Sequence, residues 1–364
     1  MKVILLNNYS MTDEWEQWKR ENYEYPTHHL WGATTLPKYG INVDILPYEK
    51  YSFLKKISDK VKILGDLDQQ MRLLWGKYDY DMIYSGNQGS TYLLALLRAI
   101  GVLRKPVVTV QHQSFKKNIW SLFFIKFILS HYDRLFCLST GLRKHLIQEF
   151  HLPEDKVVLL EWGIDLPFYQ IKYDDTIYAE KGGEKSFILS AGKTYRDYKT
   201  LTKAFKNISY PLRIYSAGDQ VSQNISDISS NVQFCTNCLS WQEILTEHAK
   251  AYAIAIPLDN TQPKSYINAI GVTSLLDAMG MGKAVVMTRN VEPCIDIEKE
   301  GIGIFVEQGD YKAWQEAISY LLEHPDETRA MGNRARRLCE EKYNLEVFTS
   351  RLSELLKDAL KSQA

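Results

Sequence analysis

The amino-acid sequence predicts an α/β protein built from two doubly wound domains that face each other across a cleft. The first observation is the length of 364 residues, since domains usually hold about 150 residues each. The second is an alternation of short apolar runs with helical patterns along most of the chain, which predicts βαβ units and parallel sheets. The third is a polar stretch without periodicity, residues 169–185, which separates two such series and is expected to be the linker.

The first series occupies residues 1–168. Its apolar runs of strand length lie at residues 3–6, 81–84, 106–110, 135–138 and 157–160. Helical patterns lie between them, for example at residues 91–100. Strands separated by helices pair in parallel, so we expect these runs to form one sheet covered by helices.

The second series occupies residues 186–344. Its apolar runs lie at residues 187–190, 212–215, 232–234, 253–257, 284–287 and 303–306. Residues 311–364 contain few helix breakers and predict helices. Ligands of doubly wound sheets bind outside the carboxyl ends of the strands, so the loops after these runs are where chemistry is expected.

Composition and motifs argue against several classes of protein. The 44 basic residues balance the 44 acidic ones, which argues against a general nucleic-acid binder. The five cysteines are an odd number, which fits a reducing compartment, and the lone pair Cys235 and Cys238 lacks the second pair of a zinc site. No G-x-G-x-x-G motif follows the first strand, which argues against a dehydrogenase. We see neither a secretory signal nor a membrane span, and we expect a cytoplasmic protein.

A loop with a glycine opens the helix predicted at residues 275–279, and it consists of Gly271, Val272, Thr273 and Ser274. Gly271 allows close backbone approach, and Thr273 or Ser274 can cap the helix. The free amides of the first turn and the helix dipole then form an anion site. Asp277, one turn along, can accept hydrogen bonds from a hydroxyl pair such as that of a ribose. The alternative is a plain capped helix with a solvated acid.

Two cations follow the strand predicted at residues 187–190. Lys193 and Arg196 lie before the next helix, where a point charge and a bidentate guanidinium would suit a diphosphate. The alternative is a solvated loop in which both cations pair with Asp197.

These residues make the second half of the chain resemble the C-terminal domain of the retaining glycosyltransferases of family 4. That family has the GT-B fold of two Rossmann-like domains. The match covers nearly all of residues 187–343 and includes Gly192, Lys193, Arg196, Asp277, Gly282, Lys283, Gly303, Met331 and Gly332. The first half resembles the family's N-terminal domain less strongly, through residues 1–5, 38–43, 81–84, 105–112, 133–139 and 162–165.

The resemblance implies how the two domains divide the work. Residues 186–344 would hold a nucleotide-diphosphate sugar, such as a UDP-sugar, and residues 1–168 would hold the acceptor. The last helix, residues 345–364, would pack back on the first domain. The donor sugar is a co-substrate, and the resemblance implies no cofactor and no metal.

The resemblance also assigns roles to donor-side residues. Lys193 and Arg196 match the pair that binds the diphosphate, and Asp277 matches a Glu that holds the ribose. Asp277 thereby matches the second Glu of the family's paired-Glu motif. The first Glu of that pair, which holds the transferred sugar, falls near Ala269, with Asn268 beside it. Asn268 is therefore the donor-side candidate at that point, and the identity of the sugar stays open.

Five residues of the first domain are further site candidates. His112 follows the strand at residues 106–110, where the family keeps a His near the sugar. The resemblance gives it a catalytic role, a hydrogen bond to the sugar or the leaving group; an ordinary loop histidine is the alternative. His28 and His29, with Gly32, could line the acceptor, and a metal is less expected there because no carboxylate or Cys stands close. Asn87 follows another strand and could contact acceptor or phosphate, although a tight turn explains it equally well.

The resemblance implies a retaining hexosyl transfer to an acceptor hydroxyl by a front-face route, in which the donor phosphate takes the acceptor's proton. The acceptor of such carbohydrate biosynthesis could be a glycan, a lipid-linked sugar or a natural product. Residues 119–129, with Lys126, could rest on the inner face of a membrane or form a buried helix. The competing functions are a nucleotide-sugar epimerase, a sugar phosphorylase, and a non-catalytic nucleotide-sugar-binding protein.

Overall fold

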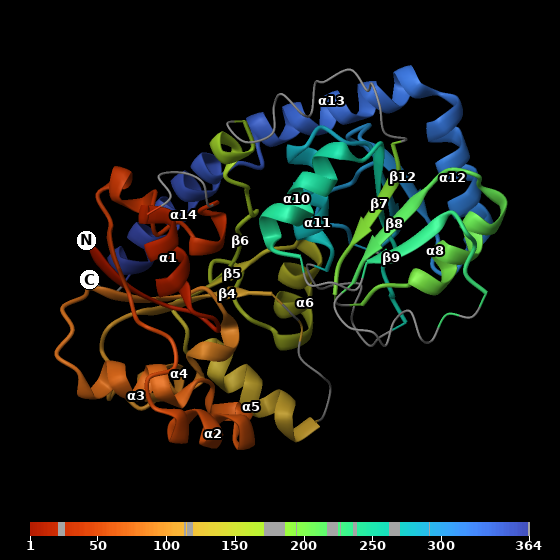
Figure 1. Ribbon diagram of the computed structural model, residues 1–364. Helices are drawn as coiled ribbons and strands as arrows, with labels where there is room; N and C mark the ends of the chain where they lie inside the picture. Colours follow the sequence, from red (N-terminus) through yellow and green to blue (C-terminus); the bar gives the residue numbers. More distant parts are fainter. Residues whose placement is uncertain are drawn as a thin grey trace. The chain divides into compact units, whose positions relative to one another are not determined.

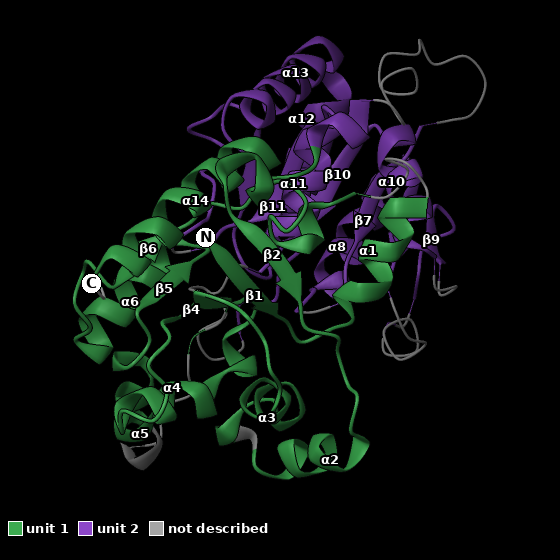
Figure 2. Cartoon of the chain, turned by 90° about the vertical axis from the view of Figure 1, so that its left-hand side faces the viewer, with its two compact units in different colours: residues 1–165, 344–364 green, residues 166–343 purple. Residues whose placement is uncertain are grey.

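The computed structural model describes residues 1–20, 26–112, 114, 119–170, 186–193, 195–216, 225, 227–235, 239–261, 270–290 and 292–362. The chain forms two compact units (Figure 2). Unit 1 comprises residues 1–165 and 344–364, and unit 2 comprises residues 166–343. Residues 166–170, expected to end the first domain and begin the linker, belong to unit 2, because Phe168 and Tyr169 are buried there against the ring of Trp241. Residues 171–185 lie outside the described residues.

Unit 1 contains a six-stranded parallel sheet with the order β2-β1-β3-β4-β5-β6. The strands are β1 (Lys2–Leu6), β2 (Asn42–Ile45), β3 (Met82–Ser85), β4 (Val107–Gln111), β5 (Arg134–Cys137) and β6 (Val157–Leu159). The five strands predicted in this half are confirmed, and each predicted end lies within about one residue of the observed end. Strand β2 was not predicted. It lies at the sheet edge and leaves Asn42 and Asp44 exposed, so its sequence lacks an apolar run.

The helices of unit 1 are α1 (Met11–Arg20), η1 (His28–Leu30), η2 (Leu36–Tyr39), α2 (Ser52–Lys60), η3 (Lys62–Leu64), α3 (Leu67–Trp75), η4 (Gln88–Ser90), α4 (Tyr92–Ala99), α5 (Ile119–Ser130), α6 (Thr140–Phe150) and α14 (Leu345–Lys361). Helices α3, α4 and α5 lie on one side of the sheet, and α1 and α14 lie on the other (Figure 1). The core between the sheet and the first group contains Ile4, Ile83, Leu94 and Leu135.

The last helix belongs to unit 1 although its residues follow unit 2 in the sequence. The N–H of Leu345 donates to the carbonyl of Ile164 at 2.7 Å, and the hydroxyl of Tyr39 donates to Glu346 at 2.6 Å. Gly163 permits this approach, because a Cβ atom there would lie 2.2 Å from the carbonyl oxygen of Asn344. The packing of α14 on unit 1 therefore depends on backbone contact as well as on side chains.

Unit 2 contains a second six-stranded parallel sheet with the order β12-β11-β10-β7-β8-β9. The strands are β7 (Ile188–Ala191), β8 (Leu212–Tyr215), β9 (Val232–Cys235), β10 (Ala253–Ile256), β11 (Val285–Thr288) and β12 (Gly303–Val306), and the predicted runs are confirmed. The helices are α8 (Tyr198–Ala204), η5 (Phe205–Asn207), α10 (Trp241–Lys250), α11 (Val272–Gly280), α12 (Tyr311–Glu323) and α13 (Pro325–Glu341). Within the described ranges, none of the helices has the length and apolarity that crossing a bilayer requires.

Candidate functional site

Two neighbouring strands of unit 2, β7 and β10, bring their carboxyl-terminal loops together. Arg196, in the loop after β7, forms an antiparallel bridge with Leu258, which follows β10. The N–H of Asp197 also donates to the carbonyl of Pro257 at 2.9 Å. This pairing holds the Arg196 loop against the segment that leads toward α11.

The side chain of Arg196 reaches the first turn of α11. Its Nη2 donates to Oγ of Ser274 at 3.2 Å, and this hydroxyl donates in turn to the carbonyl of Ala191 at 3.1 Å. The guanidinium packs over Gly192, where a Cβ atom would lie 2.5 Å from Nε of Arg196. Burial lowers the pKa of the guanidinium from its ordinary value, but an arginine stays a cation in proteins. The structure thus brings together a predicted diphosphate ligand and a predicted helix N-terminus.

The alternative pairing of the cations with Asp197 is not what the structure shows. Asp197 caps α8 by accepting from the N–H of Thr200 at 3.0 Å, and it also accepts from the amide of Gln308 at 3.2 Å. Lys193 lies two residues beyond β7 and is exposed. A solvated cation therefore lies in the same loop as the held Arg196.

The start of α11 differs from the predicted cap. Gly271 is the N-cap residue, with φ at 77°, and no side chain caps the helix. Thr273 and Ser274 lie inside the first turn, so the expectation that one of them caps it is wrong. Glycine takes this conformation without the penalty that a Cβ atom would bring. Among the residues that the structure describes, no side chain accepts from the first-turn amides, including that of Val272, as an anion site requires. Asn268 lies outside the described residues.

Asp277 is buried in unit 2 and is not the solvated acid of the alternative interpretation. Its Oδ1 accepts from the hydroxyl of Tyr169 at 2.5 Å. Burial raises the pKa of Asp277 to about 7, and the hydrogen bond from Tyr169 opposes that rise. The carboxylate expected to hold a ribose hydroxyl therefore already holds a hydroxyl of the protein itself.

In unit 1, His112 follows β4 and is held from two sides. The backbone N–H of His112 donates to Oε1 of Gln88 at 2.6 Å, and Nε2 of its ring lies 2.7 Å from the carbonyl oxygen of Gly86. A carbonyl only accepts, so Nε2 carries the proton and Nδ1 keeps its lone pair. Burial lowers the pKa of His112, and the ring stacks edge-on against Trp31. No described residue donates to Nδ1, so the neutral ring offers one acceptor.

The candidates for the acceptor side have packing or turn roles in the structure. His28 and His29 lie in η1 with ring centroids 4.3 Å apart, and both rings contact Trp162 edge-on. Burial lowers the pKa of His29 to about 4. Burial, with a smaller effect of the neighbouring His29, lowers the pKa of His28 well below its ordinary value. Gly32 has φ at 83°, and a Cβ atom there would lie 3.3 Å from Leu352 of α14.

Asn87 serves the tight turn that the sequence analysis named as its alternative role. Its Oδ1 accepts from the N–H of Gly89 at 2.8 Å, and its carbonyl accepts from Oγ of Ser85 at 2.6 Å. Among the described residues, no cluster of three or more His, Cys, Asp or Glu side chains has an arrangement that could bind a metal ion.

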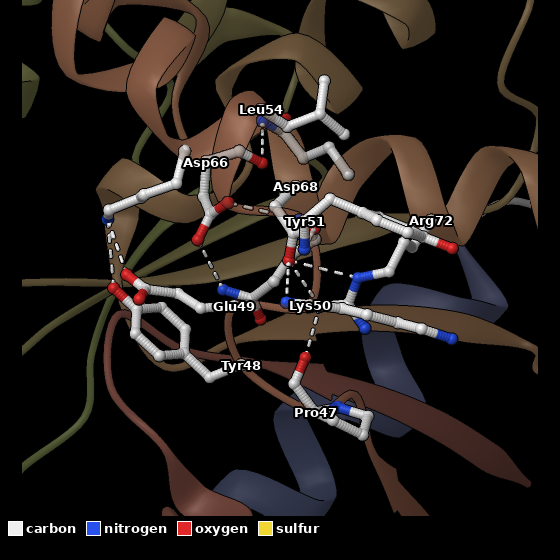
Figure 3. A network of polar contacts seen from close by, with 12 residues as sticks. Pro47, Tyr48, Glu49, Lys50, Tyr51, Leu54, Asp66, Asp68 and Arg72 are labelled. Atoms are coloured by element: carbon white, nitrogen blue, oxygen red, sulfur yellow. Dashed lines mark hydrogen bonds and ion pairs between the residues drawn. The ribbon is translucent and has the colours of Figure 1, made fainter.

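A buried polar network on α3, which the sequence analysis missed, holds the loop after β2 (Figure 3). Asp68 is fully buried and accepts from the N–H groups of Lys50 at 3.0 Å and Tyr51 at 2.8 Å. Arg72 lies 2.8 Å from the same carboxylate and also donates to the carbonyl of Pro47. The spacing of Asp68 and Arg72 by four residues was the available signal.

The next residue of α3 holds the loop after β1. Both polar atoms of the Gln69 amide pair with the backbone of Asn7: Oε1 accepts at 3.4 Å and Nε2 donates at 2.5 Å. Helix α3 therefore positions the carboxyl-terminal loops of two adjacent strands, where ligands of such sheets bind.

Two family models match consecutive parts of the chain. The model described as Glycosyltransferase Family 4 matches residues 28–168, and the model described as Glycosyl transferases group 1 matches residues 179–338. None of the curated proteins is significantly similar in sequence.

Solved structures resemble the chain over almost its whole length. A glycosyltransferase from Rickettsia africae ESF-5 has a TM-score of 0.71 and 15% identity, covering 99% of this chain and 98% of its own. Sucrose-phosphate synthase from Thermosynechococcus elongatus has a TM-score of 0.67 and 15% identity, covering 100% of both chains. Anabaena Alr3699/HepE in complex with UDP-glucose has a TM-score of 0.65 and 14% identity, covering 98% of this chain and 100% of its own. These similarities confirm the predicted GT-B fold.

Proposed function

Because the chain is a glycosyltransferase of the GT-B fold, we propose that it transfers a hexosyl group from a nucleoside-diphosphate sugar to an acceptor hydroxyl, with retention of configuration and without a metal ion. The observation that carries this proposal is the contact of Arg196 with Ser274 at the uncapped N-terminus of α11. A held guanidinium beside free helix amides is the arrangement that binds a diphosphate.

The same arrangement would stabilise the leaving diphosphate as the glycosidic bond breaks. Loss of one preorganised donor typically costs about 3–4 kcal/mol of transition-state stabilisation. Ser274 accepts a hydrogen bond from Arg196 and fixes the guanidinium at the start of α11, so little reorganisation is needed. Lys193, exposed in the same loop, would add a point charge from the solvent side.

The proposed chemistry is a front-face displacement. The bond from the anomeric carbon to the diphosphate oxygen breaks while the acceptor oxygen bonds to that carbon on the same face. The leaving diphosphate takes the proton of the acceptor hydroxyl, so atoms and charge balance. We assign His112 a hydrogen bond from a hydroxyl of the transferred sugar, because its Nδ1 keeps the lone pair.

We propose UDP-hexoses as the first donors to test, because the structurally similar HepE was solved with UDP and with UDP-glucose. Isothermal calorimetry with UDP-, GDP-, ADP- and dTDP-hexoses should show binding of at least one donor. Slow hydrolysis of that donor, followed by NMR, should release sugar in the donor's own anomeric form and should continue in EDTA. Failure to bind any of these donors would remove the proposal.

Three outcomes would favour the competing functions. A donor converted to its epimer without an acceptor would identify an epimerase. A donor that binds and is neither hydrolysed nor transferred would identify a non-catalytic binding protein. With a glycan and inorganic phosphate as substrates, cleavage of a glycosidic bond to give a sugar 1-phosphate and the shortened glycan would identify a phosphorylase.

The surface of α5 in unit 1 favours a lipid-linked acceptor over the other acceptor classes. On α5, Phe123 is 73% exposed and Phe127, one turn later, is 45% exposed. Lys126 lies beside them in the sequence, and Ile128 and Leu129 anchor the helix in the core. Two exposed aromatic side chains next to a cation suit the interface of an anionic membrane.

Vesicle sedimentation tests this surface. The wild-type protein should sediment with vesicles that contain phosphatidylglycerol, and the Phe123→Ser and Phe127→Ser double variant should stay in the supernatant. Val347→Ser on α14, where Val347 is 41% exposed, is the matched control and should bind as wild type. Equal sedimentation of the double variant would exclude α5 as the membrane contact.

A further inference from the structure

A cavity in unit 1 lies between α1 and the strands β1 and β2, and its volume is about 420 Å³. Its lining includes Ile4 and Leu46, whose side chains are almost fully buried. Volumes of about 300–1,000 Å³ are typical of small-molecule sites. All of its lining residues belong to unit 1, whereas Arg196 and α11 belong to unit 2.

Two aromatic side chains form part of the cavity wall. Trp15 comes from α1 and is half-buried, and Tyr78 comes from the loop before β3 and is 41% exposed. Such rings present an apolar face and a polar edge. The C–H face of a pyranose packs well on them, because it is apolar while the hydroxyl groups around the ring point outward.

The cavity also carries polar groups suited to sugar hydroxyls. Asp44 lines it, and its carboxylate lies 2.9 Å from the ammonium group of Lys2. Thr12 also lines it, and its Oγ1 is buried without a hydrogen-bond partner in the described part of the protein. A buried hydroxyl without a partner loses free energy relative to water, so it is a group that a ligand can satisfy.

We propose that this cavity binds one pyranose ring of a glycan acceptor, as a subsite that positions the acceptor away from the transferred sugar. The inference rests on the proposed function, since an enzyme that transfers sugars meets glycans as acceptors and products. An acyl chain fits less well, because it would desolvate the Asp44 carboxylate without offering a hydrogen bond.

Saturation-transfer NMR with gluco-, manno- and N-acetylglucosamine-type trisaccharides tests the cavity directly. At least one should bind the wild-type protein, and Trp15→Ala should weaken that binding at least tenfold, while Trp15→Phe retains part of it. Asp44→Asn, which keeps the size of the side chain, should also weaken it. Trp75→Ala is the matched control, because Trp75 is 65% exposed and lies outside the cavity, and it should bind as wild type.

Measuring donor binding distinguishes a failure of the cavity proposal from a failure of the proposed function. If calorimetry shows UDP-sugar binding but no trisaccharide binds, or if Trp15→Ala and Trp75→Ala bind the trisaccharide equally, the cavity is not a glycan subsite. If no donor binds at all, the proposed function itself fails. Thr12→Val gives a further check if Trp15→Ala does not fold, since it removes only the hydroxyl and should weaken the same trisaccharide without lowering the affinity for the donor.

Discussion

The hydroxyl of Tyr169 donates to the carboxylate of Asp277 at 2.5 Å, and both side chains are buried in unit 2. Asp277 is where the family resemblance places a ribose ligand, so the bond has a consequence for donor binding. A ribose hydroxyl that binds Oδ1 of Asp277 must displace the hydroxyl of Tyr169. The affinity for the nucleotide is then lowered by the free energy of the Tyr169–Asp277 hydrogen bond that the ribose replaces.

Tyr169→Phe should tighten nucleotide binding, because the variant removes the competing hydroxyl and keeps the ring. We expect up to about a tenfold lower Kd, which corresponds to about 1.4 kcal/mol. Calorimetry with UDP would measure it. Weaker binding in the variant would show instead that Tyr169 supports the donor site.

Stability should fall as the pH rises, because of Asp277. Burial raises the pKa of this carboxyl group from 3.8 to about 7, so the folded protein favours the protonated form. The stability that this group contributes is fully present below pH 3.8 and is lost as the pH rises toward 7, where the buried group must ionise. The whole change amounts to at most about 4 kcal/mol, at 1.36 kcal/mol per pKa unit. Urea unfolding of Asp277→Asn should show a flatter dependence between pH 5 and pH 8 than wild type. Parallel curves for the two proteins would contradict the prediction.

Arg196→Ala should lower transfer or donor hydrolysis at least 100-fold, since it removes a held cation worth about 3 kcal/mol to the leaving diphosphate. Arg196→Lys should restore only part of the rate, because a lysine cannot form the same planar contacts. Arg351→Ala is the control, as Arg351 forms only an exposed ion pair with Glu354. An unchanged rate in Arg196→Ala, with an intact fold, would remove this residue from the mechanism.

Gly271→Ala should weaken both the fold and the donor site. The alanine would take φ at 77°, and its Cβ would lie 3.0 Å from Leu258. We expect a loss of about 1–2 kcal/mol in the free energy of unfolding, together with weaker binding of UDP. Gly101→Ala is the matched control: Gly101 has φ at 73° with open space around it, so only stability should change. If both variants bind UDP as wild type does, the α11 N-terminus is not the phosphate site.

Asp68→Asn should destabilise unit 1 by about 3–5 kcal/mol, because it leaves the buried guanidinium of Arg72 without its counter-charge. Glu354→Gln on α14 breaks an ion pair that is 52% and 61% exposed, and it should change stability by less than about 1 kcal/mol. Chemical denaturation of both variants compares the two losses. Equal losses would mean that the α3 network does not stabilise the loop after β2.

The positions of the strands could be predicted because central parallel strands are buried on both faces. Residues such as 107–110 and 253–256 are therefore continuous apolar runs, a signal that each segment carries by itself. Strand β2 escaped prediction because an edge strand exposes Asn42 and Asp44. The loops after the strands could be named for the same reason, and the contact of Arg196 with Ser274 confirms that two of them meet.

The sequence by itself determined the order of βαβ units and the loops in which cations and glycines stand, because these are properties of neighbouring residues. The tertiary structure alone decided the partners of those residues. Tyr169 and Asp277 are 108 positions apart, and Arg196 and Ser274 are 78 apart. Arg196 and Ser274 meet only when the sheet brings the ends of β7 and β10 side by side, and Tyr169 and Asp277 meet only when unit 2 packs. Burial then raises the pKa of Asp277.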